Sequence, residues 1–177
     1  MGKGRKSVAN VLAKECVVSA LLKLIYEKPL SSITISELCE LAGVSRMTFY
    51  RNYGSKEDIF RKQLAELFQK YKDDGLRQPR QGIYYDKEHM MHYFTYIYRY
   101  REFMDGLMHC GFGIVFLEML DEYMLDEWSY MADRYTLTAF SGALFNMFRF
   151  WSEGNYEEKA QVLAARLEKL FCENVSA

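Results

Sequence analysis

Apolar residues recur at spacings of three and four along most of the chain, which is the pattern of helices that bury one face. The pattern predicts helices over residues 7–28, 35–42, 46–52, 56–73, 87–108, 112–128, 133–152 and a last segment after Gly154 and Asn155. Pro29 marks the end of the first helix, and Gly75, Pro79 and Gly82 make residues 73–86 a loop. Together these elements predict an all-α fold.

Residues 34–56 predict two short helices joined by a tight turn. Thr34 and Glu37 form a capping box, a pattern that satisfies free backbone donors at the start of a helix. Gly43 suits the left-handed conformation that follows a helix, and Ser45 is a good N-cap for the next helix. The residues expected to face inward are Leu38, Leu41 and Phe49. This arrangement is typical of a helix-turn-helix.

The second of these helices carries polar groups suited to DNA on the side opposite Phe49. A guanidinium, a thioether, a hydroxyl, a phenol and an amide can read base edges or hold phosphates, and they belong to Arg46, Met47, Thr48, Tyr50 and Asn52. Ser55 and Asp58 predict the start of a long helix, where Lys56 would add its ammonium to a phosphate-binding helix N-terminus. The alternative is a capped helical hairpin whose polar residues are only solvated.

Residues 34–60, with Thr-Phe-Tyr-Arg-Asn-Tyr at 48–53 and Ser-Lys-Glu-Asp-Ile-Phe at 55–60, resemble the N-terminal domain of the TetR family of bacterial transcriptional regulators. The resemblance implies a non-enzymatic, all-helical homodimer. Each subunit would join an N-terminal three-helix DNA-binding domain to a C-terminal helical domain for dimerisation and ligand binding. The expected DNA-binding domain, connecting helix and regulatory domain cover residues 1–55, 56–72 and 73–177.

The resemblance also implies roles by position in the helix-turn-helix. The base-proximal residues would be Arg46, Met47 and Thr48. The phosphate-side residues would be Tyr50, Asn52 and Lys56. Ser36, on the preceding helix, falls where some relatives contact a base or a phosphate, and its short hydroxyl favours the phosphate.

Charge is divided unevenly between the two parts of the chain. Residues 1–62 hold 11 Lys and Arg against 6 Asp and Glu, a net charge of +5. Residues 63–177 have a net charge of −6, so the whole chain is close to neutral at −1. This division of charge would turn residues 1–62 toward a polyanion such as DNA. The affinity for DNA should therefore depend strongly on salt concentration.

The composition is that of a folded protein inside a cell. The start of the chain is basic but lacks the apolar core of a signal peptide, and no uninterrupted apolar run approaches the roughly 18 residues of a membrane span. Cys16, Cys39, Cys110 and Cys172 are far apart without a C-x-x-C pair, as expected for reduced thiols. We therefore expect a cytoplasmic protein without a cofactor. Cys39 should be a small buried apolar residue, or else a redox-sensing thiol.

Residues 87–108 are unusually rich in aromatic side chains on two faces of one predicted helix. One face could pack on the core while the other lines a cavity, or both could belong to a thick core. The candidate effector-binding residues are Tyr93, Tyr96, Tyr100, Phe103, Phe116, Trp128 and Phe145, with His109 and Arg149 as polar members. Such a wall suits a small apolar or aromatic molecule. Arg149 would either anchor a ligand carboxylate or pair with an acidic residue such as Glu118 or Asp121.

The last two predicted helices are candidates for a dimer interface. The helix over 133–152 has a broad apolar face together with small residues that permit close approach, namely Ser141, Gly142 and Ala143. The final helix presents Leu163, Leu167 and Leu170 at helical spacing. Two helices joined by a short turn can meet their symmetry mates in a four-helix interface, here through about residues 133–173. This hairpin also resembles the C-terminal hairpin of TetR-family dimers.

The leading hypothesis is a repressor that binds double-stranded DNA as a homodimer and is released by a small-molecule effector. Its two recognition helices would enter successive major grooves about 34–36 Å apart, so the operator should be an inverted repeat. One alternative is a DNA-binding regulator without effector control. Another is a metal-dependent enzyme or sensor that uses His89, His92 and His109, although neither an H-E-x-x-H pattern nor a nucleophile with its base is visible.

Overall fold

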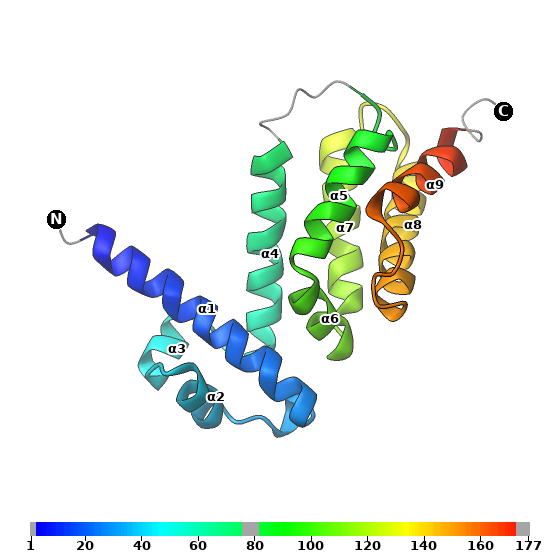
Figure 1. The fold of residues 1–177 in the computed structure, drawn as a ribbon. Coiled ribbons are helices and arrows are strands. Elements are labelled where there is room, and N and C mark those ends of the chain that lie inside the picture. Colours follow the sequence, from blue (N-terminus) through cyan, green and yellow to red (C-terminus); the bar gives the residue numbers. More distant parts are fainter. Residues whose placement is uncertain (1–2, 76–81, 173–177) are drawn as a thin grey trace. The chain divides into compact units, whose positions relative to one another are not determined.

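The computed structural model describes residues 3–75 and 82–172, and every regular element within these residues is helical (Figure 1). The elements are α1 (Lys3–Glu27), the 3-10 helix η1 (Leu30–Ser32), α2 (Ile35–Ala42), α3 (Arg46–Asn52), α4 (Lys56–Gly75), α5 (Lys87–Arg99), α6 (Arg101–His109), α7 (Gly113–Trp128), α8 (Arg134–Glu153) and α9 (Ala160–Cys172). The prediction of an all-α fold is confirmed. Within the described residues, no helix combines the length and apolar character needed to span a membrane.

The chain forms two compact units. Residues Met1–Glu66 and Gly106–Phe112 make up the first unit, and residues Leu67–Asp105 and Gly113–Ala177 make up the second. Because the boundaries fall inside α4 and α6, each of these helices contributes one part to each unit. The first unit therefore includes a segment from the middle of the chain, which the order of the sequence does not suggest.

In the first unit, α2 and α3 pack against the same long helix, α1 (Figure 1). The most deeply buried side chains of this unit come from α1, α2, α3, α4 and the second part of α6, and include Leu21, Leu38, Phe49, Ile59, Phe60 and Leu107. Phe112, which follows α6, stacks on Phe60 with ring centroids 5.1 Å apart. Burial of each such side chain contributes roughly 1.5–3 kcal/mol. This packing stabilises helices that are too short to be stable alone.

The buried face of α2 differs from the prediction by one position. Leu38 is buried as expected, but Leu41 is 49% exposed and Cys39 is buried instead. The inward face is centred on Leu38, Cys39 and Ala42, at helical spacing, and this leaves Leu41 outside it. Burial raises the pKa of the Cys39 thiol, which keeps the thiol protonated and poorly nucleophilic. The expectation of a small buried apolar residue is confirmed.

In the second unit, α5 packs along α9, and α7 packs along α8. The core is largely aromatic, and its most deeply buried members are Phe94, Phe116, Phe140 and Phe148. The single helix predicted over 87–108 is wrong, because Tyr100 separates α5 from α6 with φ −107° and ψ 21°. No glycine or proline marks this break. The Tyr100 N–H donates to the Ile97 and Tyr98 carbonyls, which closes α5, and the Tyr100 ring packs locally on Tyr96 with centroids 4.9 Å apart.

Candidate nucleic-acid interface

The turn between α2 and α3 is built by the predicted capping residues. Thr34 Oγ1 accepts a hydrogen bond from the Glu37 N–H at 3.2 Å, and Ser45 Oγ accepts one from the Thr48 N–H at 3.1 Å. Gly43 adopts the left-handed conformation, with φ 64° and ψ 29°. The Glu37 carboxylate pairs with Lys28 at 2.6 Å, and this contact holds the pKa of the Glu37 carboxyl below its ordinary value. These contacts fix where α3 begins.

One face of α3 is open to solvent and carries the candidate base-reading groups. Arg46 is exposed, Met47 is 81% exposed and Tyr50 is 53% exposed, whereas Phe49 on the opposite face is fully buried. Phe49 therefore anchors the helix while the other three side chains point away from the core. Ser36 is exposed in the first turn of α2, where its hydroxyl is free to meet a phosphate.

Thr48 is half-buried, and its hydroxyl is engaged within the turn. It lies 2.9 Å from Ser45 Oγ and accepts a hydrogen bond from Arg51 Nη2 at 3.2 Å. Arg51 is itself exposed on the last turn of α3 and places a second guanidinium beside the open face. Arg51 was not among the predicted DNA-binding residues. It could have been predicted, because it lies four residues after Met47 and therefore on the same face of the helix.

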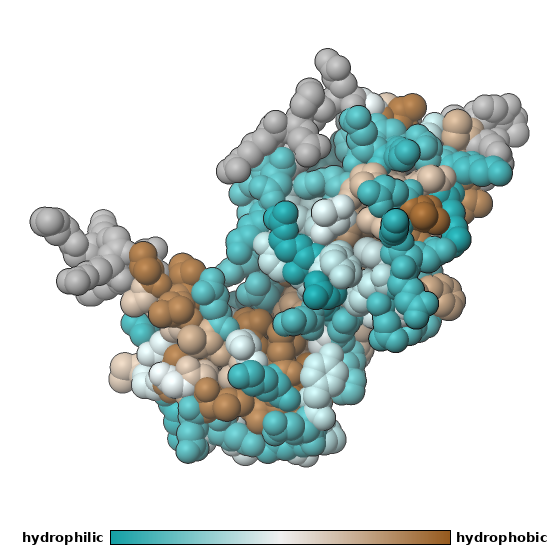
Figure 2. Space-filling model, in the orientation of Figure 1, coloured by the Kyte–Doolittle hydropathy of each residue, from teal (hydrophilic) through white to brown (hydrophobic). Residues whose placement is uncertain are grey.

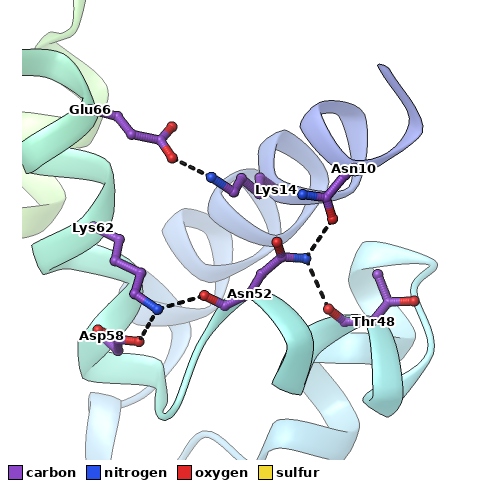
Figure 3. A network of polar contacts seen from close by, with 7 residues as sticks. All are labelled: Asn10, Lys14, Thr48, Asn52, Asp58, Lys62 and Glu66. Carbon is purple, nitrogen blue, oxygen red and sulfur yellow. Dashed lines mark hydrogen bonds and ion pairs between the residues drawn. The ribbon is translucent and has the colours of Figure 1, made fainter. Parts of the chain in front are cut away.

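Asn52 does not join the open face. Its Nδ2 donates to Asn10 Oδ1 in α1 and to the Thr48 carbonyl, both at 3.0 Å (Figure 3). The backbone carbonyl of Asn52 accepts a hydrogen bond from Lys62 Nζ of α4 at 2.8 Å (Figure 3). Asn52 therefore ties α3 to α1 and α4, an arrangement that differs from the expected phosphate contact.

Lys56 is also engaged by the protein itself. Its Nζ donates to the Ser31 carbonyl at 3.1 Å and to the Ile33 carbonyl at 2.7 Å, across the end of η1. At the start of α4, the Asp58 carboxylate accepts a hydrogen bond from the Gly54 N–H at 2.9 Å. This hydrogen bond, with that from Lys62, lowers the pKa of Asp58. The first turn of α4 is thus bound to Gly54, shortly before the helix, and the Lys56 ammonium is bound to the end of η1.

Several of the aromatic candidates of the second unit belong to one series of ring contacts. Tyr96 and Tyr100 lie together, and Phe116 contacts Phe145 with centroids 5.9 Å apart. Tyr93 donates to the Leu144 carbonyl at 3.4 Å, while Phe103 is buried. Trp128 lies in another group with His89, Tyr84 and Tyr130. Phe68, Tyr123 and Tyr71 link Phe116 and Phe145 to Tyr96 and Tyr100 through ring centroids 5.1 to 6.4 Å apart, so four of the candidates belong to one series of aromatic rings.

Tyr71, His92 and Tyr123 complete the group around Tyr96 and were not among the predicted effector-binding residues. The Tyr71 ring stacks on His92 at 4.7 Å and meets Tyr96 and Tyr123 edge-on at 5.1 and 5.5 Å. The Nε2 atom of His92 is buried and has no hydrogen-bond partner among the described residues. Burial lowers the pKa of His92 and raises the pKa of Tyr71 and Tyr96. The group thus combines a neutral imidazole with protonated phenols.

The two polar candidates, His109 and Arg149, have other partners. His109 Nε2 donates to the Ile25 carbonyl at 3.1 Å, and its ring packs on Tyr26 in the first unit. Arg149 pairs with Glu153 at 2.8 Å, one helical turn along α8.

The expectation that Arg149 pairs with an acidic residue is confirmed, but the partner is Glu153 and not one of the examples given, Glu118 or Asp121. Asp121 accepts instead a short hydrogen bond from the buried Ser141 hydroxyl. The helical spacing explains the difference, because Glu153 lies directly above Arg149 on the same helix face.

The three histidines of the metal hypothesis have separate surroundings. His89 Nδ1 lies 2.9 Å from Asp86 Oδ1, His92 stacks on Tyr71, and His109 packs on Tyr26. In the part of the chain that the structure describes, no three His, Cys, Asp or Glu side chains are grouped to hold a metal ion.

Residues 17–62 match the model of the family described as "Bacterial regulatory proteins, tetR family". No curated protein sequence matches the chain significantly. Lin0861 from Listeria innocua has a similar structure, with a TM-score of 0.74 and 16% identity over 96% of this chain and 92% of its own.

Two further solved structures share the fold. The fatty acid degradation regulator FadR from Bacillus halodurans has a TM-score of 0.58 and 14% identity, covering 89% of this chain and 93% of its own. The dihydroxyacetone kinase operon activator DhaS has a TM-score of 0.61 and 15% identity, covering 94% of this chain and 97% of its own. At these identities the similarity is one of fold.

Proposed function

This chain belongs to the TetR family of bacterial transcriptional regulators, which are DNA-binding and non-enzymatic, and we propose that it is a repressor released from its operator by a small-molecule effector. The observation that carries effector control is the buried Nε2 of His92, which lacks a hydrogen-bond partner among the described residues. A buried polar atom without a partner is costly by about 1–3 kcal/mol. A ligand that supplies the missing partner would recover that free energy.

For DNA reading, we propose the open face of α3. The Arg46 guanidinium suits the two acceptors of a guanine edge, and Met47 suits a thymine methyl group. The Tyr50 hydroxyl and the Arg51 guanidinium suit phosphates on either side. Thr48 and Ser36 remain candidates for DNA contacts through their short hydroxyl side chains. Asn52 and Lys56 have structural roles instead: Asn52 binds α1 and the Thr48 carbonyl, and Lys56 binds two carbonyls at η1.

For assembly, we propose a homodimer through α8 and α9. On α8, Tyr135 and Phe150 are exposed, the latter by 62% of its surface, and Gly142 lies between them. A β-carbon added to Gly142 would meet nothing within 4 Å, so a second helix has room to approach there. Val162 continues the exposed apolar surface on α9. Two copies related by a two-fold axis would bury this surface and present two α3 helices to an inverted repeat.

The proposed effector site is the group of Tyr71, His92, Tyr96 and Tyr123. Its rings suit an apolar or aromatic molecule, and the imidazole suits one hydrogen-bonding group on that molecule. Tyr71 belongs to α4, whose first turns carry Asp58 and Lys62 at the end of α3. A ligand that moves Tyr71 therefore acts on the same helix that holds the recognition helix. Release requires that the effector bind the two conformations with different affinity.

The test of this function starts with random duplex DNA, from which the full-length protein selects bound sequences at controlled salt. An enriched inverted repeat supports a dimeric operator-binding regulator. That duplex then serves as the probe in a screen of apolar and aromatic compounds for release. A hit should lose its effect in the variant His92→Phe, while the variant keeps its DNA affinity. If the compounds release the variant from DNA as well as they release the wild type, the effector does not bind at His92.

A second function, DNA binding without effector control, is favoured by the density of the aromatic core. Phe94, Phe116, Phe140 and Phe148 are fully buried, as in a filled interior. Under this alternative, an inverted repeat is still enriched, but no compound releases the protein from it. The same selection and screen therefore separate the two functions.

A further inference from the structure

We propose that Asn10 is a positioning residue for DNA binding, because it holds the C-terminal end of α3 through Asn52. The inference rests on the proposed use of α3 as the recognition helix. Asn10 lies near the start of α1, before the residues 17–62 that match the family. Its role is therefore read from the geometry of this chain.

Both N–H donors of the Asn52 side-chain amide are engaged within the first unit. A side-chain amide has two N–H donors, and a phosphate offers only acceptors. The two acceptors of Asn52 Nδ2 are Asn10 Oδ1 and the Thr48 carbonyl, each at 3.0 Å (Figure 3). Asn52 can donate to a phosphate only by giving up one of these bonds. Its function is to set the position of α3.

Polar bonds locate the last turn of α3 together with Tyr53, the buried residue that follows the helix and packs on Phe49 with ring centroids 5.7 Å apart. The helix has seven residues, of which Phe49 alone is buried. At its C-terminal end, the Asn52 carbonyl accepts from Lys62 Nζ at 2.8 Å, and Lys62 is itself held by Asp58 at 2.9 Å (Figure 3). With Asn10 on one side and Lys62 on the other, the end of α3 is clamped between α1 and α4.

The first turns of α1 contribute little to the apolar core of this unit. Val8, Val11 and Leu12 are exposed, and apolar residues lie at the surface over this end of α1 (Figure 2). Besides Asn10, the Lys14 ammonium ties this part of α1 to the Glu66 carboxylate of α4 (Figure 3). The start of α1 is thus attached to the unit by polar contacts. One of these contacts acts directly on the recognition helix.

The test compares the full-length wild-type protein with the variants Asn10→Ala, Asn52→Ala and the double variant. Ser19→Ala, an exposed change on α1, is the matched control. Each protein is titrated against the duplex selected by the wild type and against an unselected duplex of equal length. Thermal unfolding of every variant is recorded alongside.

Under the proposal, Asn10→Ala weakens binding to the selected duplex about 3- to 10-fold, as expected for the loss of one neutral hydrogen bond. Binding to the unselected duplex, which depends on phosphate contacts, stays within about 2-fold. The double variant is no weaker than Asn52→Ala, because both changes break the same bond. Wild-type affinity in Asn10→Ala, or additive losses in the double variant, overturns the proposal.

If Asn10→Ala lowers the thermal midpoint, Asn10→Asp resolves the ambiguity, since its oxygen still accepts from Asn52. The proposal requires that Asn10→Asp restore both the midpoint and the preference for the selected duplex at a salt concentration that screens the added charge. A restored midpoint without restored preference overturns it. Arg46→Ala separates this outcome from failure of the proposed function. If Arg46→Ala leaves base preference unchanged, the recognition face itself is misassigned; if it alters the preference while Asn10→Ala has no effect, only the role of Asn10 fails.

Discussion

Gly106 of α6 and Leu22 of α1 approach so closely that a β-carbon on Gly106 would lie 2.5 Å from Leu22 Cδ2. The same β-carbon would lie 3.0 Å from Ile25 Cδ1. One turn further along α6, His109 donates to the Ile25 carbonyl near the C-terminal end of α1. The second part of α6 is therefore packed onto α1 through a side-chain-free position. This explains why a segment from the middle of the chain belongs to the first unit.

We predict that Gly106→Val destabilises the first unit, because Leu22 and Ile25 must both shift to admit the new side chain. Overpacking of this kind costs roughly 1–3 kcal/mol. Urea unfolding followed by circular dichroism measures the change. Glu102→Val, an exposed change on the same helix, controls for the helix propensity of valine. Equal losses in the two variants would show that the close approach to Leu22 has no energetic weight.

At Gly43, the cost of a side chain comes from the backbone alone. The residue has φ 64°, and a β-carbon there would meet nothing within 4 Å. We predict that Gly43→Ala lowers the free energy of unfolding by about 1–2 kcal/mol, the penalty of the left-handed conformation. Gly43→Asn should lose clearly less, because asparagine tolerates this conformation better. Thermal unfolding of both variants tests the ordering, and an equal or larger loss in Gly43→Asn contradicts it.

Lys56→Ala distinguishes a phosphate contact from a structural one. In the structure, the Lys56 ammonium binds the Ser31 and Ile33 carbonyls. We therefore predict lower stability but an unchanged slope of log affinity against log salt. Loss of a phosphate contact would instead reduce that slope by about 1. Arg51→Ala, whose guanidinium is exposed on α3, is the comparison in which we expect the smaller slope.

Local sequence signals were sufficient for the helix-turn-helix. Thr34, Gly43 and Ser45 act through hydrogen bonds and backbone angles that depend on residues within a few positions of each. The capping residues and the limits of α2 and α3 could therefore be predicted. The exposure of Arg46 and Tyr50 followed from the burial of Phe49 on the opposite face.

Contacts between distant segments were not predictable in the same way. Asn52 has a polar side chain on a predicted DNA-binding helix, and nothing near it in sequence indicates that Asn10 will bind its amide. The break at Tyr100 likewise lacks the glycine or proline by which a sequence usually marks the end of a helix. Arg149 pairs with Glu153 because residues four apart on one helix lie close together, whereas a pair with a distant residue depends on how the helices pack.

Finally, the surroundings of His92 predict a stability that depends on pH. Burial holds the pKa of His92 below its ordinary value, although the nearby Asp74 carboxylate opposes the shift. Below about pH 6.5, where a histidine in the unfolded chain begins to bind a proton, the folded protein therefore binds fewer protons than the unfolded one. Protonation thus favours unfolding, and stability falls as the pH falls through this window.

His92→Phe should remove this dependence, because phenylalanine keeps the ring stacked on Tyr71 and has no proton to bind. We expect the thermal midpoint of the wild type to fall more steeply between about pH 7.5 and 5.5 than that of the variant. His109→Gln is the control, since it leaves His92 in place and should retain the wild-type slope. Parallel curves for the wild type and His92→Phe would mean that His92 titrates normally, and that its Nε2 is satisfied in solution without a ligand.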